Sequence, residues 1–291
     1  MICSLKFDRR SATPSHRAGF SLIELSVVLV IMSIVAAMGL ELTANFMDRT
    51  AYKVTQQRLE AIDKAIVAFR KVNNRLPCPG YQGLNTAAAC FGKEYNGSAG
   101  AGTCNNNAGA CSANNFAAGT IAFGDVPVRD LGLPLSTMLD GYGNRFIYVV
   151  NRDQVYNSGY HPTVNFSTVA DAIAVRSGKL DSTCGGGSLC QDRGMASFFV
   201  FSVGPDKRMG RTPAGNIFRG CQNGADPADV ALTDGLIDTV NCRFGTAVSL
   251  VKNGSTPISI PDNVFYDSRF NMGTTDNHFD DLVKWRSKGA L

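Results

Sequence analysis

The sequence has few of the residues from which enzymes build hydrolytic or metal-dependent active sites. Its 291 residues include three histidines and contain no Gly-x-Ser-x-Gly, His-Glu-x-x-His or phosphate-loop motif. His161 and His278 stand isolated in the sequence, and Ser177 and Lys179 have a spacing that matches no catalytic dyad. Because no convergent acid–base set is present, we expect no catalytic residue and no enzymatic activity.

Charge is also scarce outside the N-terminal segment. Charged residues make up 18% of the chain, and the formal net charge is +4. The first 19 residues hold most of this excess, with the cations Lys6, Arg9, Arg10 and Arg17 and the anion Asp8. Without that segment the net charge is about +1, which gives no electrostatic indication of a nucleic-acid partner.

One long apolar run is present, and it reads RAGFSLIELSVVLVIMSIVAAMGL at residues 17–40. Residues 20–40 are 21 positions with a single charge, Glu24. About 20 apolar residues suffice to cross a bilayer as a helix, and the basic residues upstream place the N-terminus in the cytoplasm. The sequence therefore predicts one membrane-spanning helix, with the rest of the chain on the outer side of that membrane.

The residues alone leave three interpretations of this run open. The first is a plain signal anchor, and the second is a secretory signal peptide with an apolar core at 25–35 and a cleavage motif at 35–37. The third is cleavage on the cytoplasmic side, between Gly19 and Phe20. A carboxylate inside a spanning helix costs about 2.5–3.5 kcal/mol, and only the third interpretation supplies a cation for Glu24. The new amine of Phe20 on a neighbouring helix would offset that cost and set the axial register of the two helices.

The stretch GFSLIELSVVLVIMSIVAAMGL resembles the class III signal of type IV pilins and of the pseudopilins of type II secretion. In that family a prepilin peptidase cuts after the glycine and N-methylates the next residue. The resemblance assigns Gly19 to the position before the cut, Phe20 to the N-methylphenylalanine, and Glu24 to the fifth mature residue. It makes residues 1–19 a basic leader peptide that is removed.

The resemblance implies a structural subunit, a minor pilin or a pseudopilin, of a type IV pilus-like or type II secretion filament. Its partners would be copies of itself or other pilins, the prepilin peptidase and an inner-membrane assembly platform. It would cross the bacterial inner membrane once, with its head in the periplasm, and then enter the pilus or pseudopilus. The alternative is a membrane-anchored periplasmic binding protein or adhesin that does not polymerise.

The helical pattern continues beyond the apolar run. No proline or glycine occurs between Glu41 and Asn73. Leu59, Ile62 and Ile66 recur at spacings of three and four, as on one face of a helix, and Phe69 continues this stripe. Prolines at 77 and 79 end the pattern. We therefore expect one helix to Asn73, apolar all round over 20–40 and amphipathic over 41–76.

The remainder, residues 77–291, is predicted to form an α+β head. Runs rich in β-branched and aromatic residues predict strands at 145–150, 172–175 and 196–203. A turn at 140–144 precedes the first strand, and residues 182–194 form a loop between the second and third. The Gly-, Ala- and Asn-rich region at 80–120 predicts a long, variable surface loop. A long helix followed by such strands indicates a pilin-like helix packed on an antiparallel sheet.

Three head segments are similar to pseudopilin motifs: DGYGNRFIYVV, FSVGPDKRMG and DDLVKW. In major pseudopilins the last two meet around a calcium ion, and the matching positions here are Asp206 and Asp281. Carboxylates on loops are suitable calcium ligands. This sequence has Lys207 and Arg208 after Asp206 where that pattern has glycine, and two cations should weaken calcium binding. Calcium is the one cofactor that the resemblance implies.

Nine cysteines are present, but no pair has the C-x-x-C spacing of a zinc or thioredoxin-like site. Cys3 lies in the leader. The other eight are Cys78, Cys90, Cys104, Cys111, Cys184, Cys190, Cys221 and Cys242. An even set behind an export signal favours disulfides in an oxidising compartment. The short spacings of Cys104/Cys111 and Cys184/Cys190 suggest local pairs, Cys221/Cys242 is a third candidate, and the remaining connectivity stays open.

Overall fold

The computed structural model of the chain describes parts of the sequence from residue 21 onward. These are residues 21–95, 121–151, 154–155, 173–176, 194–205, 207, 210–216, 248–250, 258–260, 264–267, 281–287 and 290–291. The described residues up to Asp48 and those from Arg49 to Leu291 belong to two separate compact units.

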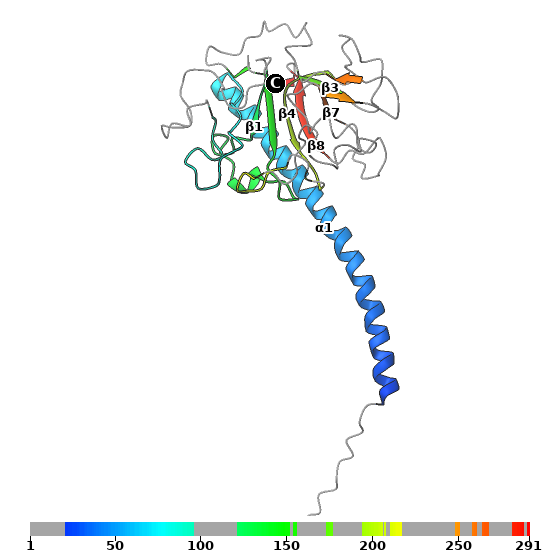
Figure 1. The fold of residues 1–291 in the computed structure, drawn as a ribbon. Helices are drawn as coiled ribbons and strands as arrows, with labels where there is room; N and C mark the ends of the chain where they lie inside the picture. The colour runs from blue at the N-terminus through cyan, green and yellow to red at the C-terminus, as the bar shows by residue number, and fades with distance from the viewer. Residues whose placement is uncertain are drawn as a thin grey trace, which may run out of the picture. The chain divides into compact units, whose positions relative to one another are not determined.

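Within the described residues the elements are one long α-helix, a short 3-10 helix and eight strands; Figure 1 shows their arrangement. Their bounds are α1 Leu22–Asn73, β1 Ile121–Asp125, η1 Leu135–Met138, β2 Ile147–Asn151, β3 Ile173–Arg176, β4 Gly194–Ser202, β5 Val248–Leu250, β6 Ile258–Ile260, β7 Val264–Tyr266 and β8 Leu282–Ser287. The predicted helix and its end at Asn73 are confirmed, and so is the α+β class of the head.

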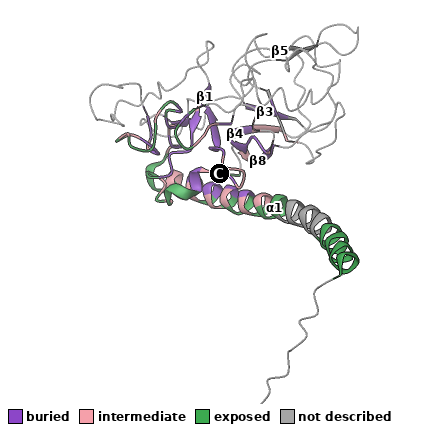
Figure 2. Cartoon of the chain, turned by 60° about the horizontal axis from the view of Figure 1, so that its bottom comes forward, coloured by how far each residue is buried: buried purple, intermediate pink, exposed green. Residues whose placement is uncertain are grey.

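The first unit contains the beginning of α1, and its apolar side chains at 22–35 are exposed (green in Figure 2). Leu22 is 88% exposed, Met32 66% and Val35 63%. Among the described residues, no helix combines the length and the apolar content needed to cross a membrane.

In the second unit, α1 buries the stripe that the sequence predicts. Ile62 and Ile66 are fully buried and Leu59 nearly so, whereas Phe69 is only partly buried. The stripe packs on one side of the sheet, where Tyr148 of β2 and Phe198 of β4 belong to the same apolar cluster. Burial of one helical face against a sheet is the usual way to stabilise an amphipathic helix.

The main sheet has the order β1-β2-β4-β3-β7, and β8 also pairs with β4. Strands β2 and β8 pair antiparallel with the same residues of β4, including Phe198 and Phe201, so they lie along its opposite edges. Strands β3 and β4 are antiparallel. The expectation of an antiparallel sheet is wrong for one pair, because β3 and β7 run parallel. Strands β5 and β6 form a separate two-stranded sheet.

Both faces of the main sheet are buried. Phe198 and Val200 belong to the cluster on the α1 side, whereas Phe199 and Phe201 belong to a second cluster with Phe265 of β7. All five side chains have 0% exposure. A strand that is buried on both faces is continuously apolar rather than alternating, which explains the run SFFVF in β4.

An ion pair joins α1 to β8 in this unit. Arg286 donates from Nε to Asp63 Oδ1 and from Nη2 to Asp63 Oδ2, each over 2.6 Å. The Asp63 side chain is 4% exposed and that of Arg286 is 34% exposed. Two parallel bonds to one carboxylate fix the rotation of α1 relative to β8 more tightly than apolar contacts alone.

The region predicted as a surface loop at 80–120 is described as far as Tyr95. These residues are irregular and partly exposed, as expected, but several of them pack into the head. Phe91 is 4% exposed and Tyr95 6%. Residues 96–120 lie outside the described residues. Strand β1, which follows them, was not predicted.

The turn before β2 comes very close to α1. A Cβ placed on Gly141 would collide with the backbone carbonyl of Ala51, whereas a Cβ on Gly143, whose φ is +86°, would meet no atom within 4 Å. We expect Gly141→Ala to lower the free energy of unfolding by about 3 kcal/mol, because backbone must move. Gly143→Ala should lower it by about 1 kcal/mol through its positive φ alone. Denaturant unfolding of both variants, followed by the fluorescence of Trp285, measures the difference. Equal losses would contradict a tight contact at Gly141.

Candidate functional site

The predicted assembly residue, Glu24, lies in the first turn of α1 with an exposed side chain. It is the only charged residue between positions 21 and 35. A carboxylate in the first turn of a helix interacts favourably with the helix dipole. Gly19 and Phe20, the predicted cleavage and methylation residues, lie outside the described residues.

Two hydroxyl groups in the same part of α1 donate to carbonyls within the helix. Ser26 Oγ donates to the Ile23 carbonyl over 2.8 Å, and Ser33 Oγ donates to the Val30 carbonyl over 2.7 Å. Glu24 is thus the one charged side chain at 21–35, and the apolar side chains around it are exposed. Such a surface suits an apolar environment that provides a single cation.

The turn that resembles a pseudopilin motif is built around the buried carboxylate of Asp140. Its Oδ1 accepts from the backbone amides of Tyr142 and Asn144, and its Oδ2 accepts from Asn144 Nδ2 and from Ser202 Oγ at the end of β4. Burial raises the pKa of Asp140, and its hydrogen bond from Ser202 acts in the opposite direction. With two donors on each oxygen, this carboxylate closes the turn and has a structural role.

Two further contacts fasten this turn to the second part of α1. Gly141 N donates to Thr55 Oγ1 over 2.8 Å, and the Arg58 guanidinium donates to the Leu139 carbonyl over 2.7 Å. Asn144 Nδ2 also donates to the Gly204 carbonyl over 2.9 Å. DGYGN and FSVG, which are parts of two segments that resemble pseudopilin motifs, thus lie in direct contact.

The described residues next to the two predicted calcium positions lie side by side. Leu282 pairs with Ser202, so the chain entering β8 lies beside the chain leaving β4. Asp281 is 6% exposed and takes part in another interaction, while Asp206 and Arg208 lie outside the described residues. No cluster of three or more His, Cys, Asp or Glu side chains that could hold a metal occurs in the described part of the chain. Calcium at Asp206 and Asp281 stays a prediction.

Two of the predicted disulfide cysteines are described. Cys78 and Cys90 are both disulfide-bonded, as expected for an oxidising compartment. The other six, at 104, 111, 184, 190, 221 and 242, lie outside the described residues.

Arg145, which precedes β2, is the centre of a buried polar cluster that was not predicted. Arg145 Nη1 lies 2.7 Å from Asp125 Oδ2 of β1, and both side chains are at most 2% exposed. The guanidinium also donates to the carbonyls of Gln82, Leu84 and Pro213 and lies 4.7 Å from the centre of the Phe91 ring. We call these groups the Arg145 cluster. A charged residue at the edge of the apolar run RFIYVV was the signal that could have indicated it.

The Arg145 cluster makes stability depend on pH through Asp125. Burial raises the pKa of Asp125 from 3.8 to about 7, although the Arg145 guanidinium opposes this shift. Between pH 3.8 and about pH 7 the folded protein therefore binds one proton more than the unfolded chain. The stabilisation that this proton provides is present at low pH and is lost as the pH rises through 7. We expect the free energy of unfolding, relative to Asp125→Asn, to fall by about 2 kcal/mol between pH 5 and pH 7.5. Denaturant titrations at both pH values measure this; a difference independent of pH would contradict it.

Comparison with known proteins gives one match. Residues 14–40 match the family model of the prokaryotic N-terminal methylation motif. No curated protein and no solved structure matches the chain significantly. The matched segment includes Gly19, Phe20 and Glu24, and it overlaps the exposed apolar beginning of α1. The chain thus contains, at residues 14–40, the prepilin-type signal of type IV pilins and pseudopilins.

Proposed function

We propose that the chain is a structural subunit, a minor pilin or a pseudopilin, of a type IV pilus-like or type II secretion filament. The observation behind this proposal is the methylation motif at 14–40, which includes the beginning of a helix whose apolar side chains at 22–35 are exposed. The folded head supports it, since α1 continues into a compact α+β unit as a pilin head requires. No catalytic role is part of the proposal.

In this proposal a prepilin peptidase removes residues 1–19 and methylates the amine of Phe20. The segment 20–40 then holds the subunit in the inner membrane, with the head in the periplasm. Assembly moves the apolar side chains of this segment from lipid into the filament core, so the transfer between two apolar surroundings changes little free energy.

Glu24 then gives assembly its direction. Its carboxylate is costly in an apolar environment when it is unpaired. Contact with the Phe20 amine of a neighbouring subunit removes that cost and sets the axial register between the two helices. A subunit that joins out of register leaves both charges unpaired.

The alternative is a membrane-anchored binding protein or adhesin, in which the helix serves only as an anchor. Crosslinking between cysteines introduced into the 20–40 segment distinguishes the two. Filament subunits should give a ladder of crosslinked species, whereas an isolated anchor should give at most an occasional dimer.

The direct test is mass spectrometry of the N-terminus of the protein from its native membrane. The proposal expects an N-methylated Phe20. An intact Met1 would indicate a simple anchor, and an N-terminus at Met38 would indicate an ordinary secreted protein; either result would overturn the proposal.

A further inference from the structure

Correct disulfide pairing is a specific problem for this chain. Eight cysteines follow the leader, and eight cysteines allow 105 different sets of pairs. Cys78 and Cys90 are both disulfide-bonded, and both lie in the segment that follows α1. The surroundings of Cys78 show how its backbone is held.

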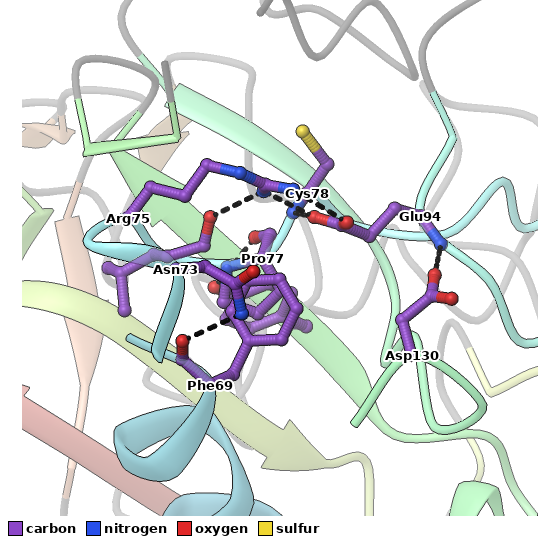
Figure 3. Close-up of polar contacts among 9 residues, drawn as sticks. Phe69, Asn73, Arg75, Pro77, Cys78, Glu94 and Asp130 are labelled. Atoms are coloured by element: carbon purple, nitrogen blue, oxygen red, sulfur yellow. Dashed lines mark hydrogen bonds and ion pairs between the residues drawn. The ribbon is translucent and has the colours of Figure 1, made fainter. Parts of the chain in front are cut away.

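The carboxylate of Glu94 connects the end of α1 to the backbone of Cys78 (Figure 3). Arg75 Nη1 and Nη2 bind Glu94 Oε1 and Oε2 over 2.6 and 2.9 Å, and the amide of Cys78 donates to the same Oε1 over 2.6 Å. The Glu94 side chain is 4% exposed and that of Arg75 is 13% exposed. We call this arrangement of Arg75, Glu94 and the Cys78 amide the Glu94 clamp.

Other non-covalent contacts hold the same segment. Glu94 N donates to Asp130 Oδ2 over 2.5 Å, and Tyr95 N donates to the Pro79 carbonyl over 3.3 Å. Gly80 and Asp125 exchange two backbone hydrogen bonds of 2.7 and 2.9 Å. None of these contacts involves a sulfur atom.

Cys90 is also held by local hydrogen bonds. Phe91 N donates to the Ala88 carbonyl over 3.0 Å, and Lys93 N donates to the Cys90 carbonyl over 3.2 Å. Only three residues separate Cys90 from Glu94 in the chain. The Glu94 clamp therefore brings the backbone of Cys78 to the turn that follows Cys90.

We propose that Glu94 positions Cys78 for disulfide formation, and thereby directs its choice of partner while the chain is still being oxidised. A cysteine thiolate attacks a small-molecule disulfide such as oxidised glutathione, forms a mixed disulfide and releases one glutathione thiolate. The thiolate of the second cysteine then displaces the other glutathione. The protein loses two electrons and two protons, and the reagent is reduced to two thiols. Glu94 takes no part in this exchange; it raises the effective concentration of Cys78 at its partner.

The test follows oxidative refolding of the full-length protein in detergent. Reduced, denatured protein is refolded in a mixture of reduced and oxidised glutathione, and samples are trapped with N-ethylmaleimide and mapped by peptide mass spectrometry. Glu94→Gln is expected to lengthen the half-time of the native Cys78 disulfide about tenfold and to increase mispaired Cys78. At equilibrium the same variant should weaken that disulfide about tenfold, which corresponds to about 30 mV in its reduction potential.

Asp63→Asn is the matched control, because Asp63 is also a buried carboxylate with two bonds from an arginine. It should leave the half-time for Cys78 within about twofold of the wild type. Arg75→Lys, which keeps the charge but not the two-bond geometry, should slow Cys78 pairing two- to threefold even if Glu94→Gln fails to fold. Wild-type rates in both clamp variants, or an equal delay in Asp63→Asn, would overturn the proposal.

Discussion

Glu24→Ala is expected to lower incorporation into filaments at least tenfold, while the protein remains processed and bound to the membrane. The alanine removes the only charged side chain between positions 21 and 35 and leaves the Phe20 amine of the neighbouring subunit without its partner. Each 1.4 kcal/mol lost from that contact corresponds to a tenfold change in the association constant. Quantitative immunoblotting of sheared filaments and of the membrane fraction measures both pools.

Ser33→Ala is the control for this experiment. Its hydroxyl is bonded to the carbonyl of Val30 in the same helix, so its loss should leave assembly unchanged. N-terminal mass spectrometry of both variants establishes that processing is intact. Normal filament incorporation of Glu24→Ala would remove the assembly role of the carboxylate, even if Phe20 proves to be N-methylated.

Arg145→Met is expected to have the largest effect on the stability of the head, a loss of about 3–5 kcal/mol in the free energy of unfolding. The methionine fills much of the same volume but removes the cation of Asp125. At pH 8, above the raised pKa of Asp125, this buried carboxyl must then either keep an unpaired charge or take up a proton. The substitution also removes the hydrogen bonds to the carbonyls of Gln82, Leu84 and Pro213. Denaturant unfolding of the full-length protein in detergent, followed by far-UV circular dichroism, measures the loss.

Two companion variants locate the origin of that loss. Arg286→Met leaves the buried Asp63 without its cation, but the arginine is 34% exposed, so water can reach the space it leaves. The loss should therefore be smaller, about 2 kcal/mol. Asp125→Asn added to Arg145→Met removes the uncompensated buried charge and should recover part of the stability. If Arg145→Met cost no more than Arg286→Met, or if the second substitution recovered nothing, the Arg145 cluster would not be held together by buried charge.

The elements predicted best are those whose signal is local. Leu59, Ile62 and Ile66 repeat with the period of a helix, so their burial follows from spacing alone. Strands β2 and β4 are apolar runs long enough to recognise, and their bounds differ from the prediction by only a few residues. The signal at 14–40 combines an apolar run with Gly19, Phe20 and Glu24, and this combination was identifiable without any structure.

The features that were missed depend on contacts between distant parts of the chain. Arg145 meets its carbonyl partners across 61, 63 and 68 residues, and no local pattern encodes such a meeting. Strand β1 is short, includes Gly124 and follows a low-complexity region, so its signal is weak. The parallel pairing of β3 with β7 joins strands that are far apart in sequence. Turn residues between consecutive strands predict antiparallel hairpins, so they give no indication of this pairing.

The Asp63–Arg286 ion pair has a consequence for the order in which the head can form. Its two residues are 223 positions apart, so a ribosome finishes the apolar face of α1 long before it makes the strand to which that helix is tied. Until β8 arrives, one edge of β4 has open backbone groups, and such an edge can pair with another chain. Contacts of this separation also slow folding. The nascent head therefore passes through an interval in which a chaperone, or a neighbouring unfinished chain, competes with β8 for the same edge.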